Sequence, residues 1–151
     1  MLESNTIEGE KRVNPGDIAA VKSALALPSI GKEELCHLHI LLGDYLKQDW
    51  VGKFRTVNVR VGRFCPVDCC QLDLAMKEYL QVFPLLDSWE AHSKFEVIHP
   101  FRDLNGRVGR LIWLNKAVHE GYKFQVPFLQ AYYYQTLYRY EKNKGLITDG
   151  L

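Results

Sequence analysis

Apolar residues recur at helical spacing along most of this 151-residue chain, and that spacing restricts the fold more than any other feature. Between residues 32 and 47 one face of an α-helix would hold positions i, i+3, i+4, i+7 and i+11, which are Leu35, Leu38, His39, Leu42 and Leu46. Similar patterns predict further helices at about 14–27, 66–82, 85–97, 105–120 and 132–140. A chain of this length is about one domain. We therefore expect residues 1–151 to form a single, all-α domain.

One segment departs from helical spacing. Residues 55–61 alternate polar and β-branched side chains with a period of two, which predicts a short strand or β-hairpin. A lone hairpin on a helical body has an exposed edge. The hairpin could be purely structural, or its edge could dock an extended peptide by strand addition. The pattern alone leaves both interpretations open.

Composition and charge exclude several classes of function. The 19 basic and 18 acidic residues give a net charge of +1, which provides no basic surface for sequence-independent nucleic-acid binding. The four cysteines show neither a disulfide framework nor a zinc-ligand spacing. No run of residues approaches the ~18 apolar residues of a membrane span, and the first residues do not resemble a signal peptide. We expect a cytoplasmic protein that binds neither nucleic acid nor membrane.

The densest chemistry lies at residues 99–110, which read His-Pro-Phe-Arg-Asp-Leu-Asn-Gly-Arg-Val-Gly-Arg. The proline and the Asn-Gly pair predict a loop that leads into a helix N-terminus, where unpaired N–H groups attract anions. Arg107 and Arg110 are one turn apart, so both guanidinium groups can reach one anion. Asp103 is a hard oxygen ligand suited to Mg²⁺. His99 is an imidazole placed to act as a general base.

Each of these residues also has an ordinary structural explanation. A histidine before proline is often structural, and two arginines on a helix are often a solvated face. The combination is harder to explain in that way, because cations in the first turns of a helix oppose its dipole unless an anion compensates them. The residues therefore predict a polyphosphate site with a metal ligand and a proton acceptor, and Phe101 should point inward to anchor the loop.

The stretch resembles the signature of the Fic (filamentation induced by cyclic AMP) family, H-x-F-x-[D/E]-G-N-[G/K]-R-x-x-R. The positions that fit are His99, Phe101, Asp103, Asn105, Gly106, Arg107 and Arg110. The similarity extends over residues 35–140 and includes the family's flap at 50–61. Leu104 stands where the family has glycine. Because leucine at positive φ is costly, we expect ordinary backbone angles at this position.

The resemblance implies an adenylyltransferase that moves AMP from ATP to a protein Ser, Thr or Tyr hydroxyl. His99 would take the hydroxyl proton, and Asp103 would hold Mg²⁺ against the α- and β-phosphates. The phosphate-binding residues would be Asn105, Gly106, Arg107 and, at the γ-phosphate, Arg110. The flap would dock the target protein through Thr56, Val57, Asn58, Val59, Arg60 and Val61. Gly106 favours AMP transfer, because the phosphotransferase branch of the family has lysine there.

A second motif lies at the N-terminus, where residues 4–9 fit [S/T]-x-x-x-E-[G/N], the inhibitory motif of Fic proteins. Ser4, Glu8 and Gly9 occupy its defined positions. Its place upstream of the domain resembles the intramolecular N-terminal class (class II), with residues 1–13 as an inhibitory segment. Glu8 would then pair with Arg110 and occupy the space that the γ-phosphate needs. The alternative is an ordinary helix N-cap by Ser4.

Two other functions stay open. Glu8 could position a water molecule that removes AMP from a modified protein, as in some relatives with this motif. The leucine at 104 keeps open a weakly active or non-catalytic nucleotide-binding module. Self-AMPylation and a homodimer are further expectations, and the rings that could stack on adenine are Tyr132, Tyr133 and Tyr134.

Overall fold

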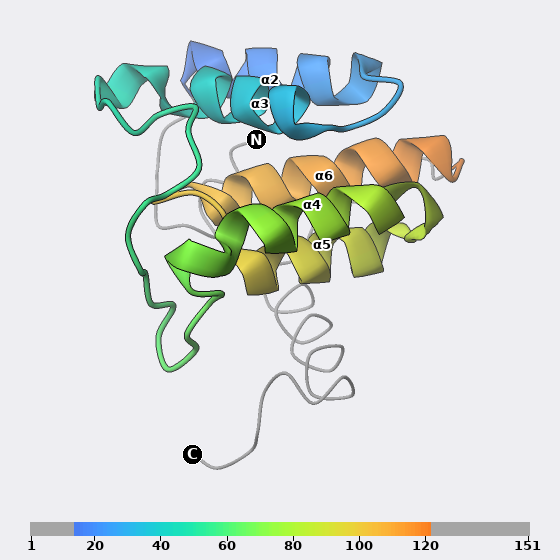
Figure 1. Ribbon diagram of the computed structural model, residues 1–151. Coiled ribbons are helices and arrows are strands. Elements are labelled where there is room, and N and C mark those ends of the chain that lie inside the picture. The colour runs from blue at the N-terminus through green and yellow to red at the C-terminus, as the bar shows by residue number, and fades with distance from the viewer. Residues whose placement is uncertain (1–13, 122–151) are drawn as a thin grey trace.

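The computed structural model describes residues 14–121, and this part of the chain is mainly helical (Figure 1). Its α-helices are α2 (Pro15–Ala26), α3 (Lys32–Gly43), α4 (Leu72–Val82), α5 (Ser88–Ile98) and α6 (Asn105–His119). Short 3₁₀ turns lie at Asp44–Leu46, Cys69–Gln71 and Phe83–Leu85. The helical spacing of the sequence is confirmed for each of these α-helices. The helix expected at 132–140 lies outside the described residues.

Helix α6 lies at the centre of this arrangement and contacts α2, α3 and α5. In Figure 1, α2 and α3 form one layer above α4, α5 and α6. Val108 and Ile112 of α6 are fully buried between these neighbours. Gly109 allows α5 to approach closely, because a Cβ atom there would collide with the Glu96 carboxylate and lie 3.0 Å from His92 Nδ1. No helix among the described residues is long and apolar enough to cross a membrane.

Local signals set both ends of α5. Its start carries a capping box, in which Glu90 N–H donates to Asp87 Oδ1 (2.8 Å) and Asp87 N–H donates to Glu90 Oε2 (3.1 Å). Its end is His99, in the left-handed conformation (φ +54°), followed by Pro100, which disfavours continuation of the helix. The chain then turns and starts α6 at Asn105. The whole 99–104 loop therefore lies where two packed helices end and begin.

The expected hairpin at 55–61 is not formed in the part of the chain that the structure describes. This segment is a loop that runs past the ends of α5 and α6 (Figure 1). The antiparallel backbone pairing found here lies at the end of the segment, where Val61 and Phe64 exchange two hydrogen bonds of 3.0 and 2.9 Å around a turn. The alternation was misleading because the side chains of Arg55 and Asn58 bind nearby polar groups, and these bonds hold the segment in place without a partner strand.

Candidate functional site

His99 is held by the end of α5. Its N–H donates to the Phe95 carbonyl (2.8 Å), and its Nδ1 lies 3.3 Å from the Glu96 carbonyl oxygen. A carbonyl can only accept, so this contact assigns the proton to Nδ1 and the lone pair to Nε2. The His99 side chain is 16% exposed. The imidazole can therefore accept a proton at Nε2 from a group bound beside the loop.

The carboxylate of Glu96 lies between two histidines. Its Oε2 is 3.7 Å from His99 Nδ1, and its Oε1 is 4.0 Å from His92 Nδ1. A carboxylate at this distance stabilises the positive charge that His99 acquires when it accepts a proton. His92 is fully buried, and burial lowers its pKa to about 4, so it is neutral near pH 7. The sequence analysis assigned no role to Glu96, although its i, i+3 spacing to His99 was a usable signal.

Phe101 is buried as expected, and it stacks on His39 with ring centroids 3.9 Å apart and an interplanar angle of 5°. His39 Nδ1 accepts the Gly52 N–H (2.8 Å), so its Nε2–H donates to the Asp103 carbonyl (3.0 Å). Burial lowers the pKa of His39, which favours this neutral form. His39 thereby ties the 99–104 loop to the chain around Gly52. The sequence had identified it only as an inward-facing residue.

The side chain of Asn105 closes the loop on itself. Its Oδ1 accepts the Phe101 N–H (2.9 Å), and its Nδ2 donates to the Phe101 carbonyl (2.7 Å). The residue is 2% exposed. Both ends of the side-chain amide are therefore engaged with the loop. The group that Asn105 can offer an anion is its main-chain N–H in the first turn of α6.

Leu104 adopts the left-handed conformation (φ +68°, ψ 11°), so the expectation of ordinary backbone angles is wrong. The residue is only 4% exposed, and burying a leucine side chain contributes about 1.5–3 kcal/mol. This offsets a left-handed backbone cost of roughly 1–2 kcal/mol. Space for the side chain comes from Gly43, where an added Cβ would lie 2.9 Å from Leu104 Cδ1.

Asp103 is exposed at the edge of the loop. Its Oδ1 accepts the Leu104 N–H (2.7 Å), which fixes the direction of the carboxylate. A single oriented carboxylate fits Mg²⁺ bound together with nucleotide phosphates, because Mg²⁺ usually takes few protein ligands. Within residues 14–121 there is no group of three or more His, Cys, Asp or Glu side chains that could hold a metal ion.

The N-terminus of α6 has the properties of an anion site. No side chain caps it, so the N–H groups of its first turn have no side-chain acceptor at the N-cap. Arg107 is 9% exposed, and within the described part of the chain its Nε and Nη1 have no hydrogen-bond partner. Arg110, 7% exposed, lies one turn further along. A buried guanidinium with free donors at the positive end of a helix calls for a bound anion.

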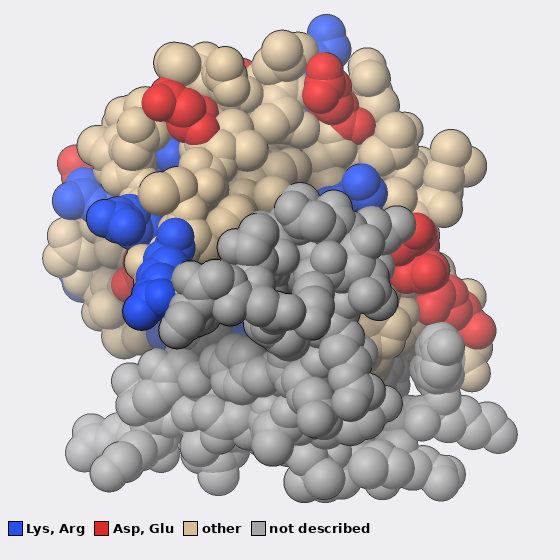
Figure 2. All heavy atoms as spheres, turned by 90° about the horizontal axis from the view of Figure 1, so that it is seen from below, with Lys and Arg blue, Asp and Glu red and all other residues tan. Residues whose placement is uncertain are grey.

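The 56–61 segment lies beside this loop and is largely exposed. The side chain of Asn58 is engaged with its own loop, because its Oδ1 accepts the Cys69 N–H (2.8 Å) and its Nδ2 donates to Asp68 Oδ2 (3.2 Å). On the face that Figure 2 shows, several lysine and arginine side chains lie together at the left, although the whole chain carries a charge of only +1.

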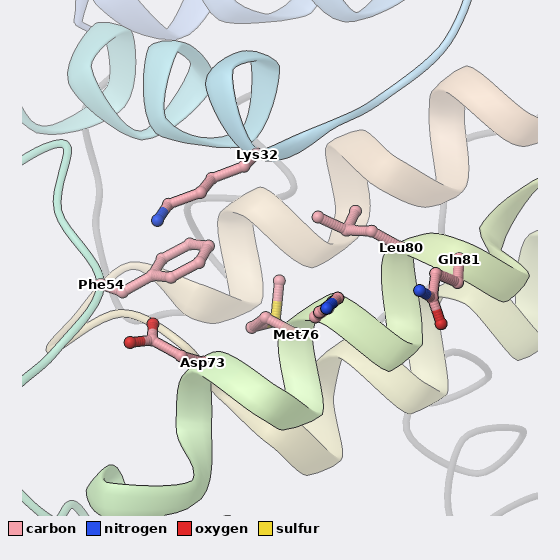
Figure 3. Close-up of a pocket in the computed structure, with 7 residues that line it drawn as sticks. Lys32, Phe54, Asp73, Met76, Leu80 and Gln81 are labelled. Carbon is pink, nitrogen blue, oxygen red and sulfur yellow. The ribbon is translucent and has the colours of Figure 1, made fainter.

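A pocket of about 440 Å³ lies between the start of α3, Phe54 and one face of α4 (Figure 3). Met76 and Leu80 contribute apolar surface, and Lys32 Nζ lies 5.1 Å from the centre of the Phe54 ring. Phe54 also packs edge-on against Phe101, with centroids 5.4 Å apart. This ring is therefore shared between the pocket wall and the anchor of the His99 loop.

Fold and site together define a helical domain whose central helix begins with two buried arginines next to the loop of His99. Residues 29–115 match the Fic/DOC family, and the chain belongs to this family. The protein adenylyltransferase fic-1 of Caenorhabditis elegans is 36% identical over 70 residues, which are 40% of this chain and 14% of that protein. The chain thus spans a small part of this curated relative.

Solved structures of Fic proteins share the fold. A Fic-domain-containing signaling protein from Bacteroides thetaiotaomicron has a TM-score of 0.67 at 19% identity, over 96% of this chain and 66% of that chain. Fic-1 from C. elegans has a TM-score of 0.66 at 20% identity, over 93% of this chain and 50% of that chain. At these identities the likeness establishes the fold alone.

Several predicted residues lie outside the described part of the chain. They are the inhibitory-motif residues Ser4, Glu8 and Gly9 and the adenine-pocket candidates Tyr132, Tyr133 and Tyr134. The class II assignment therefore stays a prediction from the sequence.

Proposed function

We propose that this chain is a Mg·ATP-dependent protein adenylyltransferase that acts in the cytoplasm. The observation that carries the proposal is the buried guanidinium of Arg107, whose Nε and Nη1 lack partners among the described residues. Several phosphate oxygens of one nucleotide would satisfy these donors together with the N–H groups that begin α6. The relative named protein adenylyltransferase supports the choice of AMP as the transferred group.

The geometry gives each residue a separate task. The target hydroxyl donates its proton to His99 Nε2, because Nδ1 is directed at the Glu96 carbonyl. The hydroxyl oxygen then attacks the α-phosphorus, and diphosphate leaves with the electron pair of the broken bond. Arg107 and Arg110 would hold the phosphates, and Asp103 would hold a Mg²⁺ ion. The metal ion supplies neutralisation of the phosphate charge.

The target would dock along the 56–61 segment through main-chain hydrogen bonds. This segment is largely exposed, although the Val57 carbonyl and the N–H and carbonyl of Val61 already have partners within the protein. Since the side chain of Asn58 is bound within its own loop, the neighbouring side chains of the segment would recognise the target peptide. A second copy of this chain is one candidate target, which would give self-AMPylation and a transient homodimer.

We further propose that Glu8 restrains this activity by pairing with Arg110. The support is the sequence match at residues 4–9 and the burial of Arg110 within one turn of the site. A bidentate carboxylate–guanidinium pair can compete with one phosphate contact. The wild-type protein should then be nearly silent, and Glu8→Gly should be active.

The test is transfer of label from ATP labelled at the α-phosphorus into proteins of a cell lysate. We expect strong transfer by Glu8→Gly, little by the wild type and none by Glu8→Gly combined with His99→Ala. Equal transfer by the wild type and Glu8→Gly would reject the restraint. If Mg·ATP failed to raise the melting temperature of the protein, the result would favour a non-catalytic binding module over an enzyme.

Removal of AMP is the second candidate, and the same N-terminal motif favours it. Glu8 would position the water molecule that attacks the protein-bound phosphate. Incubation of an AMP-modified target with the wild type and with Glu8→Gly separates the two activities. Release of AMP by the wild type, lost in Glu8→Gly, would assign hydrolysis to Glu8.

A further inference from the structure

Arg55 joins the 56–61 segment to the His99 loop, and the residue is only 4% exposed. Its guanidinium donates to main-chain carbonyls of the α5 end and of the connection between α3 and α4. On the α5 side, Nε donates to the His99 carbonyl (2.7 Å) and Nη2 to the Ile98 carbonyl (3.2 Å). On the other side, Nη1 donates to the Val57 carbonyl (2.9 Å) and Nη2 to the Val67 carbonyl.

The backbone of Arg55 adds a further bond, because its N–H donates to the Pro100 carbonyl (2.8 Å). One residue thus binds the carbonyls of three consecutive residues, 98–100. These carbonyls end α5, where the helix dipole favours a cation. Arg55 forms no ion pair with any residue in the described range, so its direct partners are carbonyl oxygens, while the Asp68 carboxylate acts on its charge from a longer distance.

We infer that Arg55 is a positioning residue, which sets the distance between the proton acceptor His99 and the segment that docks the target. It contacts His99 only through its main chain, so it acts on the reaction through geometry. Only arginine offers five donors in a planar fork. A lysine has three donors at one point and cannot reach carbonyls on both sides. The inference rests on the proposed function. It specifies how the His99 loop and the 56–61 segment are held at a fixed distance.

The kinetic test compares Arg55→Lys with its parent Glu8→Gly, in the full chain. We expect the maximal rate of AMP transfer to fall roughly 10- to 100-fold with an unchanged KM for ATP, because a misplacement of about 1 Å costs on this order. The exposed Arg63 provides the matched control, and Arg63→Lys should keep the parent rate. A parent-like rate in Arg55→Lys would overturn the inference.

Hydrogen exchange provides a readout that does not need activity. The amides to follow are hydrogen-bonded ones on each side of Arg55: His99, Phe101 and Leu104 in the loop, and Val61 and Phe64 at the end of the docking segment and just after it. In Arg55→Lys both groups should exchange faster together, while amides of α2 keep their protection. Faster exchange in only one group, or in all helices equally, would contradict a positioning role.

The two readouts separate the possible failures. If Glu8→Gly transfers no AMP, the proposed function fails and the exchange result alone decides the role of Arg55. If Arg55→Lys does not fold, native-state exchange of the wild type replaces it. The two groups of amides should then open with the same dependence on denaturant. Independent opening would overturn the inference.

Discussion

At the scale of single residues, the buried guanidinium of Arg107 carries an energetic cost in the part of the chain that the structure describes. Its guanidinium is buried without a partner for Nε or Nη1 among the described residues. A buried polar group without hydrogen bonds costs about 1–3 kcal/mol in proteins. Under the proposed function, bound phosphate would offset this cost, so the protein without nucleotide would be less stable at this position than it could be.

Replacing Arg107 with methionine tests both the energetic cost and the proposed binding of phosphate. We expect Arg107→Met to raise the free energy of unfolding of the nucleotide-free protein by roughly 1–3 kcal/mol and to abolish its stabilisation by Mg·ATP. Thermal unfolding with and without Mg·ATP measures both effects. Lys94→Met, an exposed site on α5, is the control and should keep the nucleotide response. An Arg107→Met protein that is less stable, yet still stabilised by Mg·ATP, would refute this account.

Leu104 and Gly43 form a second pair at this scale. An added Cβ at residue 43 would lie 2.9 Å from Leu104 Cδ1 and 3.2 Å from Val51 Cγ1. Gly43→Ala should therefore cost about 1–3 kcal/mol of stability through overpacking. In a Leu104→Ala background the same change should cost at least ~0.5 kcal/mol less. Urea unfolding of the four proteins gives this coupling, and an additive cycle would show that the two side chains do not compete for space.

At the scale of elements, the helices were predictable and the loop between α3 and α4 was not. Periodicity reports which face of a helix is buried, and each α-helix of the described part follows it. The alternation at 55–61 predicted a strand, but local side-chain bonds from Arg55 and Asn58 replaced the pairing. Alternation alone does not reveal which side chains will bind the backbone.

The bonds of Asn58 should matter for the docking loop and little for the helices. Asn58→Ala removes the acceptor for the Cys69 N–H and the donor to Asp68. In the Glu8→Gly background we expect a raised KM for the protein target, with the KM for ATP unchanged. The global stability should fall by no more than about 1 kcal/mol, because the bonds are exposed. A change confined to the KM for ATP would argue against docking at this segment.

At the scale of the whole molecule, the site depends on contacts between distant parts of the chain. The motif residues themselves were identifiable from local order and spacing. The supports of the loop were not, because His39 reaches Asp103 and Arg55 reaches His99 across 64 and 44 residues. The roles of Asn105 and Leu104 also depended on burial, which local spacing does not report. The local pattern thus identified the motif residues, and tertiary packing determined their geometry.

Global stability should depend on pH through the buried histidines. Burial lowers the pKa of His92 to about 4 and also lowers that of His39, whereas both titrate near 6.5 when unfolded. Between these values the unfolded chain binds more protons, so stability falls as pH drops below about 6.5. His92 alone should account for about 2 kcal/mol between pH 7 and pH 5. Urea unfolding at both pH values measures this loss, and His92→Gln should show a smaller one; an equal loss in the variant would assign the effect to other groups.

The most direct test of the proposed chemistry follows two labels in parallel. Glu8→Gly receives ATP labelled at either the α- or the γ-phosphorus, and protein-bound label is measured after removal of free nucleotide. AMP transfer predicts protein-bound label from the α-phosphorus only, and its loss when His99→Ala is added. Protein-bound label from the γ-phosphorus, or α-label that survives His99→Ala, would contradict AMP transfer with His99 as the base.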